Sequence, residues 1–427
     1  MPVPEPPEAK NSGMSDLWYR IDEQGRLILP AVSGSIEQKL ILPPASRGRF
    51  FEEADGIRLE RPIDQLAKIY VEVTNRCNLT CRGCMRHGWD EEFGFMADTI
   101  FGNVIAGLEG LAFRPTIFFG GFGEPLFHEK IVDMVSQAKT AGARVELISN
   151  GILLSEDLAW RLIAAGLDFL WVSLDGASPE SYADVRMGDH LPQILDNLHR
   201  LHRNRILGTG RPRGPELGIS FVAMKRNIND LPRILDLGLR LGASRFLVSN
   251  VEAYSAAMEA ENLYGRSLNN LPRLHRLDMP RMDIDTNNEA MLGSLARRFT
   301  IPGRVTPTDE DPFGACPFLL RGSASVRWDG RVSSCLPLLH AHTVYLNGRP
   351  RFWPEYHVGS VAERKLIAIW NDPEYTRFRG RLRDFNFAPC TLCNSCDLAD
   401  LNGEDCFGNA HPACGGCLWA QGFIQCP

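Results

Sequence analysis

The sequence predicts an α/β fold built on a parallel sheet, followed by a small cysteine-rich domain. After Leu66, short apolar runs alternate with longer amphipathic segments, and repeated strand–helix alternation produces a parallel sheet, either open or curled into a partial barrel. Nine of the 12 cysteines fall between Cys316 and Cys426, in a segment with little helical periodicity. Such a segment has difficulty building an ordinary core, so we expect it to fold around metal.

The alternating region defines the expected elements. We expect strands at residues 69–73, 116–119, 145–148, 169–174, 219–223 and 246–248. We expect helices at residues 130–141, 156–165, 192–203 and 231–241. In a parallel sheet the loops at the carboxyl ends of the strands carry the reactive groups. The motifs discussed below all follow expected strands.

Four regions are expected along the chain. Residues 1–65 are predicted to be a flexible tail followed by a small β-rich extension, because short apolar stretches there are interrupted by Gly, Pro and Ser. Residues 66–255 form the α/β core, and the polar residues 256–312 form a bridge. Residues 313–427 form the cysteine-rich domain.

Composition narrows the class of protein. The chain has 427 residues, 44% of them hydrophobic, and a mild formal charge of -6, which gives no support for nucleic-acid or membrane-surface binding. No apolar run is long enough to span a bilayer, and the Pro- and Glu-rich start has no signal-peptide features. We therefore expect a cytoplasmic protein. In a reducing compartment, cysteines indicate metal binding or redox chemistry more than disulfides.

The first three cysteines form a compact motif after the strand expected at residues 69–73. Cys77, Cys81 and Cys84 have the spacing C-x3-C-x2-C, and three thiolates can hold three irons of a four-iron, four-sulfur cluster. The fourth iron is then free to bind a substrate or cofactor. The alternative is a zinc site, which usually takes four ligands, and His87 is the nearest further candidate.

Polar and glycine residues follow the next three strands. A glycine-rich turn after residues 116–119 allows close approach of a ligand, and its carboxylate can pair with an ammonium group. Each residue alone is typical of a cap or a turn, but their common position at successive strand ends favours a binding site. The candidates are Gly120, Gly121, Gly123, Glu124, Asn150, Ser173, Asp175 and Arg186.

Residues 69–251 resemble the radical SAM superfamily through the cysteine motif and these strand-end residues. The resemblance implies a partial (β/α)6 TIM-like barrel, a 4Fe-4S cluster held by the first three cysteines, and S-adenosyl-L-methionine bound to the open iron. It also implies that Ser173 and Asp175 contact the ribose and that Arg186 contacts the carboxylate. Two departures are Gly83, where the family usually has an aromatic residue, and two residues inserted before Glu124.

The C-terminal cysteines resemble the SPASM domain, which carries auxiliary iron–sulfur clusters. The resemblance covers residues 313–427 and begins with the C-x13-G-x4-C spacing of Cys316 and Cys335. Nine cysteines suffice for one or two auxiliary clusters with four ligands each and one cysteine left over. Zinc remains an alternative, since C-x2-C pairs also suit it. The metal candidates here are Cys316, Cys335, Cys390, Cys393, Cys396, Cys406, Cys414, Cys417 and Cys426.

Residues 84–96 and 414–427 resemble the subgroup of cofactor-modifying proteins associated with tungsten-containing aldehyde ferredoxin oxidoreductases. This implies a maturase that reductively cleaves S-adenosylmethionine to a 5′-deoxyadenosyl radical and modifies a cofactor or protein. Its electron donor would be a ferredoxin or flavodoxin. Two alternatives stay open: a peptide- or protein-modifying maturase, and a non-enzymatic iron–sulfur electron carrier or zinc scaffold. No residue can be named as a proton or hydrogen donor.

Overall fold

The computed structural model describes residues 20–21, 27–30, 49–53, 56–60, 65–109, 111, 114–206, 214–265, 276–286, 288–299, 315–393 and 396–427. The chain divides into two compact units, Met1–Gln65 and Leu66–Pro427. In the first unit, four antiparallel strands form a sheet with the order β1-β2-β4-β3. These strands are β1 (Arg20–Ile21), β2 (Leu27–Pro30), β3 (Arg49–Glu53) and β4 (Gly56–Glu60).

The second unit contains the predicted parallel sheet. Its central strands lie in the order in which they occur in the chain, and each pairs in parallel with the next. They are β5 (Lys68–Val71), β6 (Thr116–Phe119), β7 (Val145–Ser149), β8 (Phe169–Ser173), β9 (Glu216–Ala223) and β10 (Ala243–Asn250). The strands are apolar and buried along most of their lengths, as strands covered on both faces require.

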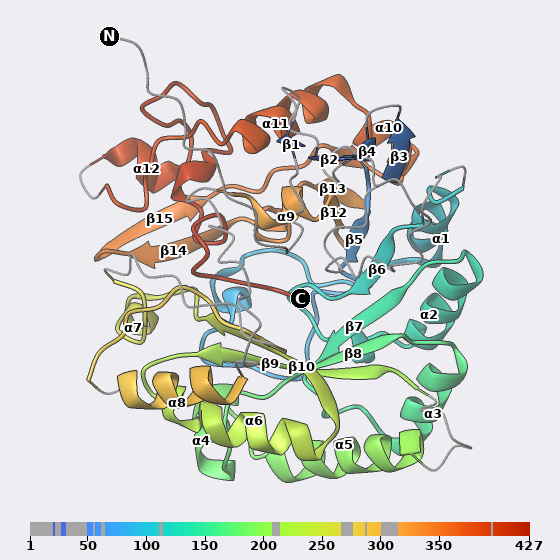
Figure 1. Ribbon diagram of the computed structural model, residues 1–427, viewed down its shortest axis with the longest axis vertical. Helices are drawn as coiled ribbons and strands as arrows, with labels where there is room; N and C mark the ends of the chain where they lie inside the picture. Colours follow the sequence, from blue (N-terminus) through green and yellow to red (C-terminus); the bar gives the residue numbers. More distant parts are fainter. Residues whose placement is uncertain are drawn as a thin grey trace, which may run out of the picture. The chain divides into compact units, whose positions relative to one another are not determined.

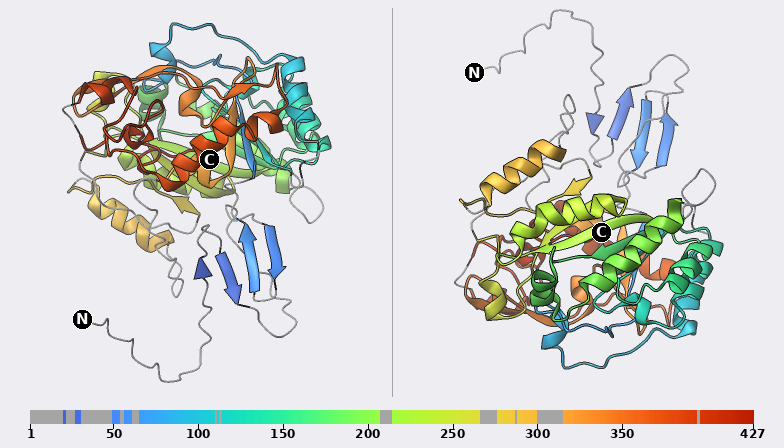
Figure 2. Two further views of the ribbon diagram at one scale, coloured as in Figure 1. Left: turned by 90° about the horizontal axis from the view of Figure 1, so that it is seen from above. Right: turned by 90° about the horizontal axis from the view of Figure 1, so that it is seen from below.

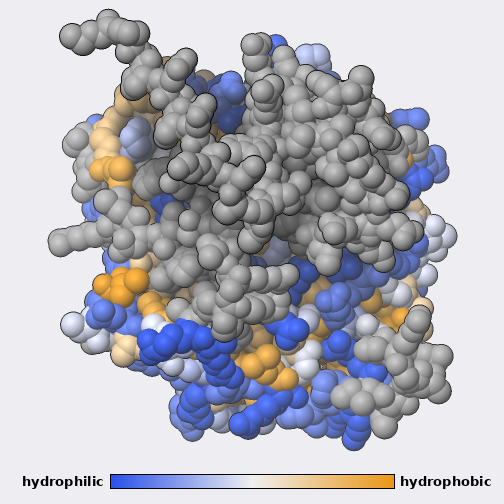
Figure 3. Space-filling model, in the orientation of Figure 1, coloured by the Kyte–Doolittle hydropathy of each residue, from blue (hydrophilic) through white to orange (hydrophobic). Residues whose placement is uncertain are grey.

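Helices connect these strands and lie along the outer side of the curved sheet (Figures 1 and 2). They are α1 (Asp98–Ala106), α2 (Ile131–Thr140), α3 (Glu156–Ala164), α4 (Pro179–Arg186), α5 (Leu191–Ile206) and α6 (Leu231–Arg240). Ser155 and Ser178 cap α3 and α4 by accepting backbone N–H groups in the first turn. Hydrophilic residues gather over α5 and α6 at the lower edge of Figure 3, so these helices turn polar faces to solvent.

Residues after β10 extend the same sheet rather than forming a separate one. Strand β11 (Leu277–Asp278) pairs with β10, and β12 (Ser323–Val326) pairs in parallel with the other edge of β5. Strands β13 (Arg331–Ser333) and β16 (Gly359–Ser360) continue the sheet beyond β12, giving ten strands. The region predicted as an irregular bridge contains α7 (Ala256–Glu259), β11 and α8 (Glu289–Phe299).

The remaining elements surround the C-terminal cysteines. Strands β14 (His342–Leu346) and β15 (Arg349–Trp353) form an antiparallel hairpin. The helices are α9 (Pro317–Leu320), α10 (Leu366–Trp370), α11 (Pro373–Asp384) and α12 (Asp397–Leu401), and short 3-10 turns include Pro337–Leu339 and Cys414–Gly416. Among the described residues, no helix is long and apolar enough to cross a membrane.

One apolar cluster joins the core strands to the C-terminal region. Tyr70, Phe118 and Trp171 from the core strands pack with Phe318 and Leu339 from the C-terminal region, and all are buried. The rings of Phe118 and Phe318 lie edge-on to Tyr70, at centroid distances of 5.2 and 5.7 Å. This packing makes the C-terminal region part of the same hydrophobic core.

We therefore expect Phe118→Ala to lower the free energy of unfolding of this unit by about 3–5 kcal/mol, because it removes a buried aromatic ring. Phe352→Ala is the matched control, since Phe352 also lies on a strand but is 42% exposed, and it should cost about 0.5 kcal/mol or less. Anaerobic urea unfolding of the two variants measures the difference. Equal losses would contradict a shared core at Phe118.

Candidate metal centres and cofactor site

The first three cysteines lie in the loop that follows β5. Cys77, Cys81 and Cys84 are free thiols and each is partly buried. Two arginines approach their sulfurs: Arg86 Nε lies 3.3 Å from Cys84 Sγ, and Arg186 Nη1 lies 3.7 Å from Cys81 Sγ. Burial raises the pKa of Cys77, while Arg86 opposes that rise. Guanidinium groups beside thiols stabilise the thiolate form, which is the form that binds metal.

A zinc site at this loop would need a fourth protein ligand besides the three cysteines. His87, the nearest further candidate ligand, is exposed, and its Nε2 lies 2.8 Å from the backbone oxygen of Cys81. That nitrogen is therefore already engaged by the backbone. Among the residues that the structure describes, no group of three or more His, Cys, Asp or Glu side chains is arranged to hold a single metal ion. Three thiols in this loop therefore fit a four-iron cluster with one open iron better than a tetrahedral zinc site.

The glycine-rich turn packs directly on the end of β5. A Cβ atom on Gly123 would lie 2.1 Å from the backbone oxygen of Thr74, and one on Gly121 would lie 2.7 Å from Glu72 Cγ. A Cβ on Gly120 would lie 2.5 Å from the Phe118 ring. The sequence suggested that these glycines allow a ligand to approach. In the structure they allow the turn itself to approach the cysteine loop.

Glu124 and Asn150 tie the ends of β6 and β7 to that loop. The buried Glu124 carboxylate accepts the backbone N–H groups of Leu126 and Asn150, at 3.0 and 2.7 Å, and burial raises its pKa. The Asn150 amide donates to Asn78 Oδ1 at 2.8 Å. These predicted residues therefore do meet at one edge of the sheet, and Asn78 joins them.

Asp175 and Arg186 pair with each other at the end of β8. Arg186 Nη2 lies 2.5 Å from Asp175 Oδ2, and the backbone N–H of Val222 donates to Asp175 Oδ1 at 2.8 Å. Burial lowers the pKa of Arg186, but the negative charges of Asp175 and Cys81 outweigh this and raise it. Its Nε is buried and has no partner among the described residues, as an anion-binding group requires. The Ser173 hydroxyl at the strand end also has no hydrogen bond to any described residue.

Other residues occupy the space that an aromatic side chain before Cys84 would take. A Cβ on Gly83 would lie 3.2 Å from Val251 Cγ2 and 3.4 Å from Met258 Cε. These two side chains belong to a buried apolar cluster with Val185 and Met224. Apolar contact at this position is thus supplied from the end of β10 and from α7. Nothing in the local sequence around Cys84 indicated it.

Four C-terminal cysteines converge on one buried cavity. Cys316, Cys335, Cys414 and Cys417 line it together with Trp353, Phe378 and Trp419. Burial raises the pKa of each of these four thiols, and in three of them neighbouring cysteines of the same set raise it further. Thiols that line one apolar cavity are costly as isolated anions, and a bound metal cluster would offset that cost.

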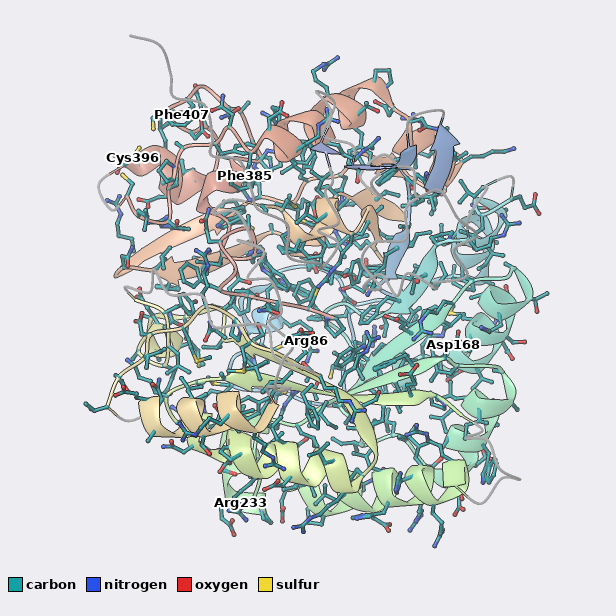
Figure 4. The ribbon with its side chains drawn as sticks, in the orientation of Figure 1. Arg86, Asp168, Arg233, Phe385, Cys396 and Phe407 are labelled. Carbon is teal, nitrogen blue, oxygen red and sulfur yellow. The ribbon has the colours of Figure 1, made fainter. Side chains whose placement is uncertain are left out.

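The next four cysteines gather at the outer edge of the C-terminal region. Burial, then Asp405 and Cys406, raise the pKa of Cys390 to about 11, and Arg351 donates to the backbone oxygens of Cys390 and Cys393 at 2.7 and 2.9 Å. Cys396 precedes α12 and lies at the same edge as Phe407, the neighbour of Cys406, whereas Arg86 lies in the central part of the molecule (Figure 4). These four form a second candidate ligand set.

Cys426 belongs to neither set of four. Its Sγ lies 3.6 Å from the Tyr70 hydroxyl and 3.7 Å from Arg321 Nη1, against the core cluster. Arg321 also donates to the Cys426 backbone oxygen at 2.9 Å. Cys426 thus packs against the core cluster beside Arg321, consistent with one cysteine being left over.

Comparisons with known proteins agree with this geometry. Residues 71–212 match the radical SAM superfamily, and residues 316–397 match SPASM, an iron–sulfur cluster-binding domain. The chain thus carries a radical SAM domain followed by a SPASM domain, which makes it an enzyme whose cofactors are 4Fe-4S clusters and S-adenosylmethionine. These matches favour an enzyme over an electron carrier or a zinc scaffold.

The chain is 29% identical over 364 residues to the tungsten-containing aldehyde ferredoxin oxidoreductase cofactor-modifying protein of Pyrococcus furiosus, covering 84% of this chain and 96% of that protein. It is 24% identical to the PqqA peptide cyclase of Granulibacter bethesdensis, covering 82% and 83% of the two chains. The structure of polyhistidine-tagged anSMEcpe with bound AdoMet has a similar fold, with a TM-score of 0.50 at 13% identity, covering 84% of this chain and 93% of that chain.

The contact at Gly123 yields one prediction. Because a methyl group there would collide with the backbone at Thr74, we expect Gly123→Ala to destabilise the loop by about 3 kcal/mol and to reduce iron retained at the first cluster. Gly88→Ala is the matched control, because nothing lies within 4 Å of a Cβ at that glycine. Iron and sulfide analysis after anaerobic reconstitution distinguishes them, and equal iron in both variants would contradict the packing described.

The two C-terminal cysteine sets yield another prediction. Cys335→Ala and Cys414→Ala should each lower bound iron by about four per chain, and the double variant by no more, if both residues hold the same four-iron cluster. Combining Cys335→Ala with Cys393→Ala should remove about eight irons, as two four-iron clusters require. Cys426→Ala is the control and should leave iron unchanged. Loss of about four irons, one whole cluster, in Cys426→Ala would show that the sets are wrongly drawn.

Proposed function

We propose that this enzyme is a radical SAM maturase that modifies the cofactor or protein of a tungsten-containing oxidoreductase. The observation that carries the proposal is the likeness to the Pyrococcus furiosus cofactor-modifying protein, which spans 96% of that protein and 84% of this chain. We also propose four regions along the chain. The N-terminal sheet lies in residues 1–65, the radical SAM core is residues 66–255, the bridge is residues 256–312, and the SPASM-like domain is residues 313–427.

The residues of the first site have distinct proposed roles. When bound, a four-iron cluster and S-adenosylmethionine supply reductive cleavage of the sulfonium group and abstraction of a hydrogen atom. Cys77, Cys81 and Cys84 hold three irons, and Arg86 places a guanidinium beside the Cys84 sulfur. The unpartnered Nε of Arg186 binds the carboxylate of S-adenosylmethionine, and the free hydroxyl of Ser173 binds a ribose hydroxyl.

Several strand-end residues act by orienting others. Asp175 fixes the Arg186 guanidinium through their 2.5 Å ion pair. Glu124 and Asn150 hold the turn and the cysteine loop together through their side chains. Any direct contact of these two residues with S-adenosylmethionine uses backbone or side-chain atoms that do not take part in these hydrogen bonds. Glycines 120, 121 and 123 let the turn close over the loop, which excludes water.

A second candidate is a maturase that acts on a peptide or protein side chain. It is favoured by the likeness to PqqA peptide cyclases, which covers 82% of this chain for one relative and 79% for another. The likeness is weaker in identity than that to the cofactor-modifying protein. The two candidates therefore differ in the target and share the same cofactor chemistry.

We also propose a one-electron donor of the ferredoxin or flavodoxin class and a cytoplasmic location. The cluster requires an electron for each cleavage, and such carriers supply electrons at low potential. All 12 cysteines are free thiols, which is the state that a reducing compartment maintains.

The test uses the reconstituted enzyme with S-adenosylmethionine, dithionite and a tungsten-containing aldehyde oxidoreductase isolated from cells that lack this enzyme. We expect 5′-deoxyadenosine to form faster with the oxidoreductase present, together with a change in mass of its cofactor or polypeptide. The Cys81→Ser variant is the control for cleavage. An unchanged mass and an unchanged rate would contradict the tungsten assignment, and acceleration by a candidate peptide instead would favour the second function.

A further inference from the structure

A buried histidine of the C-terminal region lies between two carboxylates of the radical SAM half. The side chain of His340 is fully buried, and its Nε2 lies 2.9 and 3.1 Å from the two carboxylate oxygens of Glu72. Its Nδ1 lies 2.5 Å from Glu91 Oε1. Nε2 is hydrogen-bonded to Glu72, whereas Nδ1 and Glu91 Oε1 lie at ion-pair distance without hydrogen-bond geometry. Carboxylate oxygens against both ring nitrogens favour the charged imidazolium form.

Aromatic side chains and an arginine complete this enclosure. Trp89 stacks on the His340 ring at a centroid distance of 4.2 Å, and Phe122 meets it edge-on at 5.6 Å. Arg327 Nη2 binds Glu91 Oε2 at 2.8 Å. Stacking on an aromatic face favours a cation, and the rings keep water away from the ion pairs, which strengthens them.

The two carboxylates belong to the loops that form the cofactor site. Glu72 follows β5 and precedes the cysteine loop, and its Oε2 accepts the backbone N–H of Phe122 in the glycine-rich turn at 3.1 Å. Gly121 packs against the same side chain. Glu91 lies in the segment that follows Cys84. His340 thus connects the turn to the segment after the third cysteine.

We propose that His340 is a positioning residue for the radical SAM site: as an imidazolium bridging Glu72 and Glu91, it holds the glycine-rich turn and the segment after Cys84 in the arrangement that binds S-adenosylmethionine. The C-terminal domain would then contribute to the first site through a side chain as well as through metal. The proposal concerns cofactor binding and is independent of the identity of the substrate.

The charges around His340 fix the expected pH dependence. Burial lowers the pKa of His340, but Glu72 and, after it, Glu91 together outweigh burial and raise the pKa to about 9. Two other ionisable groups lie nearby. Arg327 binds Glu91 and Glu355, and burial lowers the pKa of His342 to about 4, which leaves this histidine neutral. Because the folded pKa exceeds the ordinary value of about 6.5, the bridge is complete near pH 6.5 and is lost as pH rises through about 9.

The experiment measures binding of radiolabelled S-adenosylmethionine to the reconstituted enzyme by equilibrium dialysis between about pH 6.5 and about pH 10, a range that spans the ordinary histidine pKa and the raised one. We expect His340→Gln to weaken binding about tenfold near neutral pH, the size typical of losing an outer-shell partner. Wild type should lose affinity through about pH 9, and the variant should not. The amino group of S-adenosylmethionine titrates at about pH 8 with wild type and with the variant alike. The difference between their two binding-versus-pH profiles therefore reports the titration of His340.

Two further variants keep the test decisive. His411→Gln is the matched control, because His411 also lies in the C-terminal region but bonds the Asn402 backbone oxygen, and it should bind as wild type does. If His340→Gln fails to fold or to take up iron, Glu91→Gln replaces it and should move the midpoint of the pH profile downward. Wild-type affinity and profile in His340→Gln, or an unmoved midpoint in Glu91→Gln, would overturn the proposal.

Discussion

Strand β5 hydrogen-bonds to a neighbour along both of its edges, and this double pairing positions both metal-binding regions of residues 66–427. One edge pairs with β6 of the core and the other with β12 of the C-terminal region. Along the strand, Tyr70 packs into the shared core cluster, and the residue after the strand end, Glu72, meets His340. The loop that follows carries the first three cysteines. A shift of β5 would therefore disturb the core, the cysteine loop and the contact with the C-terminal region together.

The first cysteine loop and the C-terminal cavity differ in charge and in burial, and so in what metal binding must supply. The first loop has arginines beside the sulfurs of Cys84 and Cys81, so positive charge already lies where metal-binding thiolates are needed. The cavity lined by Cys316, Cys335, Cys414 and Cys417 is apolar, and burial raises the pKa of all four thiols. Metal binding must therefore supply the free energy for ionising these thiols, which makes that part of the fold dependent on its cluster.

Local sequence patterns predicted the fold well where neighbours in the chain determine it. The strand at 116–119 and the start of the helix at Glu156 were predicted at the bounds observed, because apolar runs and a serine cap are local signals. Strand β12 was missed, since its four residues are stabilised by pairing with β5. Helix α8 was missed because the polar composition around it indicated a bridge.

In the candidate sites, too, the sequence predicted the residues that share a local motif and missed those brought together by tertiary packing. Spacing predicted the cysteine motif, and strand-end positions predicted Asn150 and Asp175. Arg186, predicted a short helix later, reaches Asp175 from the end of α4, and the binding roles of these residues stay predictions. Spacing gave no grouping of the C-terminal cysteines, because Cys335 and Cys414 are brought together by tertiary packing. His340 and Met258 had no signal, since each reaches the site from an element distant in the chain.

Cys77, Cys81 and Cys84 are proposed to hold the cluster that cleaves S-adenosylmethionine, while the two C-terminal sets of four cysteines hold separate metal. This assignment is tested most directly by measuring dithionite-dependent 5′-deoxyadenosine and bound iron in wild type and in Cys77→Ala. The account predicts that the variant forms no 5′-deoxyadenosine and retains the iron of the C-terminal region, about eight per chain for two four-iron clusters. Cleavage that persists in Cys77→Ala would contradict the assignment of the first site.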